Sequence, residues 1–434
     1  MELEVWLNGT HVAMLSENRR QLTMVYTGEA HPIGAPLVSV AMPVGAGRYS
    51  DPKVRAFFRG LLPEGEARRI LAYDFGLDES DDMGLLAALG KDCAGALVVQ
   101  PKGDGPSLVA GASTKDTVDD AEIGRRLRAL PVHPLGVDAH IRVSLAGVQS
   151  KLLLTRLEDG RWVLPADGVV STHILKPAHR DLPDTVVNEA FCMNLAARSG
   201  LKAARTTILS FAGTEVLVSE RYDRRLEVGT IRRMHQEDAC QALSVLTIVP
   251  EHKYEEFGGP TLVGIARLLE QWGDAQSKEE LLRQIAIHVI VGNADAHGKN
   301  VSFLHQEDGT VGLAPVYDIM STEYYTAAYA RPMSPTLGLF VNAKRNINEV
   351  TVEDLLSEAE RWGMRYGTAQ SVLTQLLERL PNALDQAARD VPDVPQALID
   401  LVHERMTRAR AEAARLGELV PRRSESFDDG AKGS

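Results

Sequence analysis

The stretch Asn293-Ala294-Asp295-Ala296-His297-Gly298-Lys299-Asn300, followed by Tyr317-Asp318, decides the expected fold of this 434-residue chain. In protein kinases, an aspartate of the catalytic loop accepts the proton of the substrate hydroxyl, an asparagine five positions later holds one metal ion, and a further aspartate holds another. Asp295, Asn300 and Asp318 stand in that order. On its own, the spacing also fits an Asx-rich turn at the end of a helix, so other segments must agree.

The residues before this stretch predict a rigid support for it. The mainly apolar run 285–291 would anchor the loop in a core, while the polar end of the loop faces a cleft. Ser277-Lys278-Glu279-Glu280 has the form of a capping box and predicts the start of the helix that runs into the loop. Catalysis by positioning requires such a support.

Length and composition predict an ordinary globular protein of several parts. The chain exceeds a single average domain, and 44% apolar with 24% charged residues argues against a disordered or fibrous protein. The formal net charge of −12 opposes autonomous binding to nucleic acid, because such binding needs a basic surface.

The cysteines and the apolar runs indicate where in the cell the protein is expected. Cys93, Cys192 and Cys240 are scattered without C-x-x-C spacing, which argues against a disulfide framework or a zinc site. No apolar run approaches the roughly 20 residues that span a bilayer. The start, Met1-Glu2-Leu3-Glu4, lacks the basic and apolar regions of a signal peptide. We expect a soluble, cytoplasmic protein without a membrane partner.

The order of sequence patterns predicts an α+β, kinase-like fold with two lobes and an additional N-terminal part. We expect a β/α subdomain at 1–110, a β-rich nucleotide-binding lobe at 111–250, and a helical C-terminal lobe with the catalytic and metal-binding loops at 251–420. Residues 421–434 are polar and predict a disordered tail.

Periodicity predicts the main elements within these parts. Apolar alternation predicts strands at 141–145, 151–157, 162–164, 173–175, 207–209 and 216–218. Helical spacing predicts helices at 66–73, 184–198, 351–362, 368–380 and 394–416. One helix therefore falls within the β-rich lobe, and a mostly helical region follows.

Other segments supply the remaining parts of a phosphate site. Small residues at 144–151 would let backbone N–H groups approach phosphate oxygens, although a hairpin turn fits this segment as well. Lys176 ends a predicted strand, where it could pair with α- and β-phosphates, and Glu189 on the next helix would hold it. A surface lysine and a surface glutamate remain the alternative, but the order along the chain favours the functional interpretation.

Two further predictions concern the nucleotide base and the catalytic loop. Glu220 and Tyr222 follow a predicted strand just before the helical part, where a hinge would offer backbone groups to adenine; a plain strand end is the alternative. His297 has no second His or Cys at ligand spacing, so we expect it to orient its loop rather than bind zinc.

Taken together, these segments resemble the HipA family of bacterial type II toxin–antitoxin serine/threonine kinases, and the likeness covers nearly the whole chain. The stretches that carry it, in order, are 57–65, 90–96, 144–151, 172–176, 220–224, 236–241, 295–300 and 317–319. The resemblance implies a kinase-like fold with a family-specific N-terminal subdomain.

The resemblance also implies the cofactors and the site. ATP and Mg²⁺ would be the cofactors, Asp295 the catalytic proton acceptor, and Asn300 and Asp318 the Mg²⁺ ligands. The nucleotide-binding residues would be Ala146, Gly147, Val148, Gln149, Ser150, Lys151, Lys176, Glu189, Glu220, Arg221, Tyr222, His297, Gly298, Lys299, Asn300, Tyr317 and Asp318.

Regulation and partners are implied in the same way. The family autophosphorylates the serine that matches Ser144, and a phosphate adds roughly −1.5 to −2 charges beside the loop that must hold ATP. Relatives act on aminoacyl-tRNA synthetases, notably glutamyl-tRNA synthetase, which stalls translation and favours persistence. A small helix-turn-helix antitoxin dimer, HipB-like, restrains them, and this acidic chain would reach operator DNA chiefly through that partner.

Two other functions remain open at the level of sequence. The D-x-H-x-x-N pattern also resembles the loop of phosphoinositide kinases, so a small-molecule or lipid kinase is one alternative. The other is an inactive kinase fold that acts as a corepressor through an antitoxin, although the complete set of metal- and proton-handling residues weighs against it.

Overall fold

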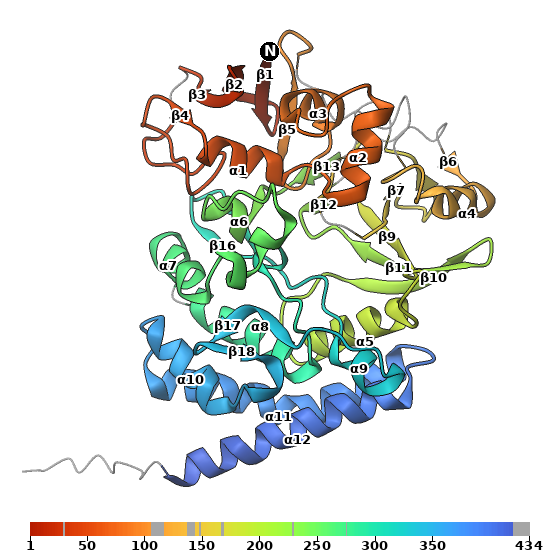
Figure 1. Cartoon of the computed structure of the whole chain (residues 1–434), viewed down its shortest axis with the longest axis vertical. Helices are drawn as coiled ribbons and strands as arrows, with labels where there is room; N and C mark the ends of the chain where they lie inside the picture. The colour runs from red at the N-terminus through yellow and green to blue at the C-terminus, as the bar shows by residue number, and fades with distance from the viewer. Residues whose placement is uncertain are drawn as a thin grey trace, which may run out of the picture.

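In a computed structural model, the chain forms three packed parts; in Figure 1 the N-terminal part lies at the top, the middle part at the right below it, and the third part at the left and along the base. The residues that the structure describes are 1–28, 31–105, 117–136, 144–146, 149–165, 169–227, 230–274 and 276–419. Within these residues no helix is both long enough and apolar enough to cross a membrane. Cys93, Cys192 and Cys240 are free and buried.

The N-terminal part is an antiparallel sheet covered by three helices. Its elements are β1 (Glu2–Leu7), β2 (Thr10–Asn18), β3 (Gln21–Tyr26), β4 (Tyr49–Ser50), α1 (Lys53–Gly60), α2 (Gly65–Asp74), α3 (Asp82–Leu89) and β5 (Leu97–Pro101). The sheet order is β4-β3-β2-β1-β5. Leu3, Val5, Leu22 and Met24 alternate along their strands and are fully buried, because every second side chain of a strand points to the same face.

The middle part is a six-stranded sheet in the order β10-β11-β9-β7-β8-β6. Its elements are β6 (Thr117–Val118), α4 (Asp120–Ala129), β7 (Leu152–Arg156), β8 (Trp162–Val163), β9 (His173–Pro177), α5 (Thr185–Arg198), β10 (Thr206–Phe211) and β11 (Thr214–Glu220). The hairpin β12 (Arg224–Glu227) and β13 (Thr230–Arg233) follows. Helix α5 joins this sheet to the largest hydrophobic core of the molecule.

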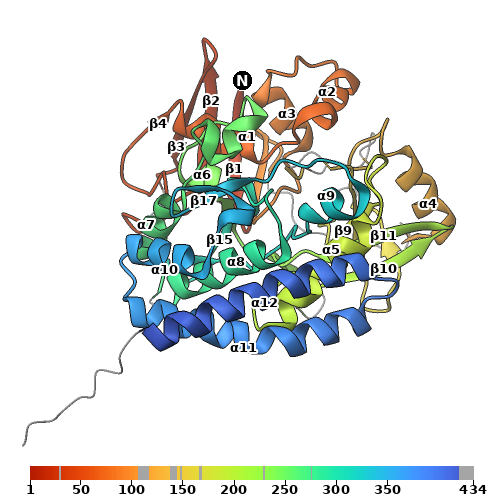
Figure 2. The same cartoon turned by 60° about the horizontal axis from the view of Figure 1, so that its bottom comes forward.

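The third part is mostly helical. Its elements are β14 (Gln236–Asp238), α6 (Ala239–Ala242), η2 (Pro250–Lys253), η3 (Glu255–Phe257), α7 (Leu262–Trp272), α8 (Ser277–Val291), η4 (Gly298–Asn300), β15 (Ser302–His305), β16 (Val311–Leu313), α9 (Glu323–Tyr329), β17 (Thr336–Val341), β18 (Lys344–Asn346), η5 (Ile347–Glu349), α10 (Val352–Arg361), α11 (Tyr366–Asp390) and α12 (Gln396–Leu419). The long helices α11 and α12 lie across its base (Figure 2), and α8 is buried above them.

The predicted mixture of strands and helices is confirmed, with two corrections. Helix α11 does not end at Leu380 but continues through Pro381, because buried residues beyond the proline keep packing in the core. Helix α8 begins at Ser277 as predicted, yet no side chain caps its first turn, and the Ser277 hydroxyl donates to Asp274 instead. The predicted strand at 141–145 lies largely, and the tail at 421–434 wholly, outside the described residues.

Candidate active site

A cleft of about 1260 Å³ lies where the three parts meet. Residues from each part line it, including Glu64 of the N-terminal part, Lys176 and Glu189 of the middle part, and Asp295 and Asp318 of the helical part. The cleft therefore brings together side chains that are up to about two thirds of the chain apart in sequence.

Lys176 is the centre of a charged cluster on the floor of this cleft. It is the last residue but one of β9, and its Nζ lies 2.6 Å from Glu189 Oε1 on α5 and 2.6 Å from Asp318 Oδ1. Burial by itself would discharge the ammonium, but the two carboxylates outweigh burial and hold the pKa of Lys176 above its usual range. Burial raises the pKa of Glu189 to about 7, so Asp318 is the permanently ionised partner.

Asp318 connects this cluster to Asn300, the other predicted metal ligand. Its carboxylate opens toward the cleft, and although burial opposes ionisation, Lys176 keeps the pKa of Asp318 well below its usual range. Asp318 Oδ2 accepts a 3.1 Å hydrogen bond from Asn300 Nδ2. The backbone of Asp318 has a φ of 60°, a left-handed conformation that non-glycine residues adopt mainly where a site requires it.

The pair Asn300 and Asp318 fits an Mg²⁺ site of the kinase type. Mg²⁺ takes oxygen ligands and is usually bound by one or two protein groups together with substrate phosphates and water. Asn300 now turns its amide nitrogen toward Asp318, and rotating the amide by half a turn would present Oδ1 instead. Within the described residues, no cluster of three His, Cys, Asp or Glu side chains offers an alternative metal site.

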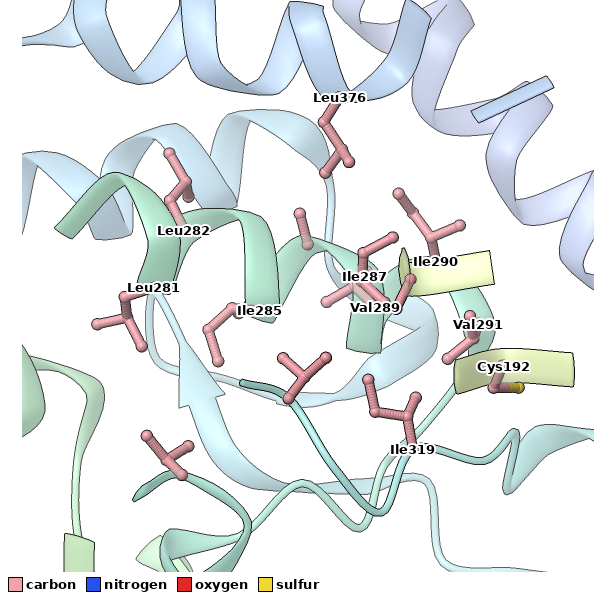
Figure 3. Close-up of a cluster of buried hydrophobic side chains, with 14 of the residues drawn as sticks. Cys192, Leu281, Leu282, Ile285, Ile287, Val289, Ile290, Val291, Ile319 and Leu376 are labelled. Carbon is pink, nitrogen blue, oxygen red and sulfur yellow. The ribbon is translucent and has the colours of Figure 1, made fainter. Parts of the chain in front are cut away.

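The predicted catalytic loop is held at its start by hydrogen bonds and by the core. Helix α8 ends at Gly292, whose φ of 72° turns the chain into the loop. Ala294 N donates to Thr322 Oγ1 at 3.0 Å, and Ala294 O accepts from Gly338 N at 2.8 Å. Figure 3 shows Ile319, the neighbour of Asp318, among the apolar side chains of α8. The two loops that carry Asp295 and Asp318 are thus anchored in the same core.

Asp295 lines the cleft, and among the described residues its carboxylate has one hydrogen-bond partner. Asp295 Oδ1 accepts a 2.7 Å hydrogen bond from the hydroxyl of Tyr254. Surrounding protein raises the pKa of Asp295, although water in the cleft reaches the group, and the Tyr254 hydroxyl partly offsets this rise. The Tyr254 ring meets the ring of His297 edge to face at 5.1 Å. Burial lowers the pKa of His297 to about 3, so the imidazole is neutral.

The predicted phosphate loop is described only in part. Lys151 Nζ donates to Ala146 O at 2.6 Å, and Gln149 and Ser150 line the cleft. Gly147 and Val148 lie outside the described residues. Burial, together with nearby Lys176, lowers the pKa of Lys151 to about 8. A bound anion would favour its charged form, because an opposite charge stabilises an ammonium.

Ser144 lies just before this loop and is enclosed by the N-terminal part. Its side chain is 0% exposed, its Oγ donates to Leu61 O at 2.6 Å, and its backbone N donates to Asp92 O at 3.0 Å. In this conformation the hydroxyl cannot reach the cleft unless the segment moves.

Some predicted nucleotide residues direct their side chains elsewhere. Lys299 Nζ pairs with Asp238 at 3.0 Å and with Glu64 at 3.1 Å, so it connects η4 to the end of β14 and to the N-terminal part. Glu220 is exposed at the end of β11. Gly298 lies against Pro260, whose Cγ would be 2.4 Å from an added Cβ. These residues line the cleft or support it without forming a single phosphate-binding cluster.

The aromatic pair in the cleft consists of Tyr222 and Tyr317. Their ring centroids are 5.6 Å apart. Tyr222 donates to Gln236 Oε1, and Tyr317 donates to Lys299 O at 2.6 Å. Both hydroxyls are thereby fixed, and the two rings offer an apolar surface in the expected hinge region.

Arg221 belongs to a buried ion network between the N-terminal and middle parts. Its guanidinium bonds Asp223, Ser171 Oγ and the carbonyl of Cys93. Asp92 completes the network by accepting from Arg224 at 2.9 Å and from Ser171 Oγ at 2.6 Å. The Arg221 guanidinium therefore binds the N-terminal part, and the residue also lines the cleft.

Sequence reasoning did not assign Glu64, Asp92 or Tyr254. Glu64 lies in stretch 57–65 and Asp92 in stretch 90–96, and both stretches carry the family resemblance. Opposite charges in stretches 295–300 and 220–224 could have indicated their ion-pair partners. Tyr254 lies in an irregular segment 41 positions from Asp295, and no local pattern marks it.

Family models and known relatives match most of the chain. A family model described as the HipA N-terminal domain matches residues 3–100, and one described as a HipA-like C-terminal domain matches residues 143–384. A putative kinase of Sinorhizobium fredii is 36% identical over 402 residues, which cover 90% of this chain and 93% of that protein. The serine/threonine-protein kinase toxin HipA of Shewanella oneidensis is 28% identical over 433 residues and 96% of each chain.

A solved structure is similar over nearly the whole length. It is the complex of HipA, HipB and operator DNA from the Shewanella oneidensis toxin–antitoxin system, with a TM-score of 0.78, 26% identity and coverage of 96% of this chain and 97% of that one. This match confirms the predicted α+β, kinase-like fold class.

Proposed function

This chain belongs to the HipA family of kinases, and from that premise we propose that it is an ATP- and Mg²⁺-dependent serine/threonine protein kinase, the toxin of a type II toxin–antitoxin system. The observation that carries the proposal is the convergence of Lys176, Glu189, Asn300 and Asp318 on one side of the cleft that also holds Asp295. These are the groups that phosphoryl transfer needs, since its catalysis is mainly positioning and electrostatic stabilisation.

Each group has a defined task in this proposal. Lys176, held by Glu189, binds the α- and β-phosphates, while Asn300 and Asp318 hold Mg²⁺. When bound, ATP and Mg²⁺ supply the transferable phosphoryl group and neutralise its charge. Asp295 orients the acceptor hydroxyl and takes its proton. The Lys176 to Asp318 bond must then be shared with the incoming ligands, which is consistent with the solvent access of Asp318.

The proposed substrate is a protein of the translation apparatus, an aminoacyl-tRNA synthetase such as glutamyl-tRNA synthetase, whose phosphorylation would arrest growth in the cytoplasm. The proposed restraining partner is a helix-turn-helix antitoxin of the HipB type, because the similar Shewanella protein was solved with HipB and operator DNA. The net charge of −12 supports contact with DNA mainly through such a partner.

We further propose that Ser144 is an autophosphorylation site that limits activity. The enclosed position of Ser144 supports this idea, because a phosphate there has no room and would displace the segment that leads into the phosphate loop. Phosphorylation would first require the segment to move out, and the added charge would then keep it out.

The decisive experiment compares the wild-type chain with Asp295→Asn in the presence of radiolabelled ATP, Mg²⁺ and purified glutamyl-tRNA synthetase. The amide keeps the shape of the side chain and an acceptor for Tyr254, but it cannot take a proton. We expect phosphate transfer to fall by at least 100-fold, because general-base catalysis contributes about 10²–10⁴-fold. ATP binding should persist.

The control is Asp308→Asn, which changes an exposed turn that bonds Thr310 and lies outside the cleft. It should retain the wild-type rate. Equal transfer by wild type and Asp295→Asn would refute the assigned role of Asp295. Labelling of small molecules but no protein, with cell lysate as the acceptor, would favour a small-molecule or lipid kinase instead. Nucleotide binding without any transfer would favour the inactive corepressor.

A further inference from the structure

The segment between α6 and α7 lines part of the cleft, and one of its residues, Tyr254, contacts Asp295. It lies between η2 and η3, and its hydroxyl donates to Asp295 Oδ1 at 2.7 Å. Among the described residues, no other side chain donates to this carboxylate, and none reaches Oδ2. One oxygen of Asp295 is therefore held by protein, and the other is open to the cleft.

The backbone around Tyr254 is rigid. Tyr254 O accepts from Phe257 N at 3.1 Å and from Gly259 N at 2.9 Å, so the segment folds on itself. The next residue, Glu255, accepts from Phe340 N on β17 at 2.7 Å. These bonds fix the position of the Tyr254 backbone relative to the helical part.

The ring of Tyr254 is held as firmly as its backbone. Its edge-to-face contact with His297 uses the neutral imidazole of the same loop that carries Asp295. Lys253 Nζ lies 5.4 Å from the centroid of the Tyr254 ring on another side. This gives His297 a physical task that agrees with the sequence-based expectation that it orients the loop.

We propose that Tyr254 is a positioning residue for phosphoryl transfer: its hydroxyl holds Oδ1 of Asp295, so that Oδ2 faces the acceptor hydroxyl. This inference rests on the proposed kinase function. In the reaction, the acceptor proton passes to Asp295, the acceptor oxygen bonds the γ-phosphorus, the bond from the γ-phosphorus to the bridging oxygen breaks, and ADP leaves. Tyr254 gives up no proton, because burial and the Asp295 carboxylate hold its pKa above the usual range.

Two other interpretations compete with positioning. The Tyr254 hydroxyl is bonded to Asp295, the residue that the acceptor hydroxyl must also reach, so it could instead block the acceptor or accept the phosphoryl group itself. The tethered backbone and the bond to Oδ1 alone favour positioning, because an acceptor can still approach Oδ2. The interpretations predict opposite changes when the hydroxyl is removed.

The test compares the wild-type chain with Tyr254→Phe, which removes the hydroxyl and keeps the ring. We expect kcat for protein phosphorylation to fall about tenfold, the effect of losing one hydrogen bond to a charged group. The KM for ATP should change less than about twofold, since the ring and the phosphate-binding residues remain. The matched control is Tyr73→Phe, an 84% exposed tyrosine on α2, which should behave as wild type.

A pH profile separates positioning from a merely structural role. The hydroxyl bond favours the ionised form of Asp295, so its removal should move the acidic limb of the kcat profile to higher pH. Lys253 and Asp318 also act on Asp295, the former lowering and the latter raising its pKa, and both stay in the variant. A purely structural defect would lower kcat without moving the limb.

A measurement that needs no activity completes the test. Carbon NMR of selectively labelled aspartate, with Asp295→Asn used for assignment, reports the pKa of Asp295 in wild type and in Tyr254→Phe. We expect a higher pKa in the variant. An equal pKa, an increased kcat, or phosphate found on Tyr254 after incubation with ATP would each overturn the proposal. A wild-type chain that transfers no phosphate would instead contradict the proposed function, while the NMR comparison still decides the Tyr254 bond.

Discussion

At the scale of single residues, the proposed switch at Ser144 depends on the enclosure of its side chain by the N-terminal part. We predict that Ser144→Glu lowers the affinity for Mg²⁺ and an ATP analogue at least tenfold, because a carboxylate cannot remain in the enclosed position beside Leu61 O. Ser144→Ala should lose only one hydrogen bond, worth about 1 kcal/mol of unfolding free energy, and keep nucleotide affinity within about twofold. Titration calorimetry and denaturant melts measure the two effects.

The control for this prediction is Ser371→Glu on the exposed face of α11, which adds the same charge far from the cleft. It should leave nucleotide affinity unchanged. If Ser144→Glu binds the analogue as tightly as Ser371→Glu does, the segment tolerates a charge where it is, and Ser144 is not a switch.

The sequence was most informative about residues whose spacing is set by chemistry. Asp295 and Asn300 must face one phosphate from a short loop, so their separation is visible in the chain, and Lys176 and Glu189 were found from the strand and helix that carry them. Tyr254 could not be found, because its contact with Asp295 depends on tertiary packing alone. Arg221 lines the cleft, but the sequence did not reveal that its guanidinium also bonds a buried network that only the folded N-terminal part creates.

At the scale of elements, the end of α8 sets the position of the catalytic loop. Gly292 has a φ of 72°, and a Cβ there would lie 3.0 Å from Glu323 Cβ. We predict that Gly292→Ala lowers the unfolding free energy by about 1–2 kcal/mol, from the left-handed backbone and the close contact together. It should also lower kcat, because the loop that carries Asp295 starts one residue later. Denaturant melts and transfer assays measure both.

Gly213→Ala is the matched control, since Gly213 has a φ of 78° in the β10–β11 turn and nothing lies within 4 Å of an added Cβ. It should show the backbone cost without the contact, and kcat should stay at the wild-type value. Equal kcat for Gly292→Ala and wild type would mean that the helix end does not position the loop.

The helices also show where sequence patterns stop being informative. The predicted helix ended at Leu380, and the next residue, Pro381, lacks an N–H and disfavours a helix interior. Helix α11 nevertheless continues to Asp390, because Ala383, Leu384 and Ala387 are buried in the main core and their packing outweighs the lost hydrogen bond. The proline destabilises the helix locally, but the packing of the residues beyond it in the tertiary structure decides whether the helix continues.

At the scale of the whole molecule, the contacts that join the N-terminal part to the kinase-like lobes include, among the described residues, two ion-paired links. One is the pair Glu64 and Lys299, which connects the N-terminal part directly to the catalytic-loop segment. The other is the network around Asp92, where the carboxylate lies among Arg221, Arg224 and Arg233. The stretches that identified the family therefore serve partly to assemble the cleft, and the N-terminal part is a wall of the active site.

The Asp92 network makes a prediction about stability and pH. Burial opposes the charge of Asp92, but the three arginines outweigh burial and lower the pKa of its carboxyl group. The stabilisation by the ionised carboxylate is therefore present at neutral pH. It is lost as the pH falls from about 3.9, the usual pKa in unfolded chains, through the lower pKa of the folded state. Asp92→Asn leaves the buried guanidinium groups under-compensated and should cost about 3–5 kcal/mol at pH 7. Asp159→Asn, in an exposed pair with Arg161, should leave the unfolding free energy almost unchanged. Denaturant melts between pH 3 and 7 should show the gap between Asp92→Asn and wild type narrowing toward acid. A gap that stays constant, or a neutral-pH cost equal to that of Asp159→Asn, would show that this network does not hold the parts together.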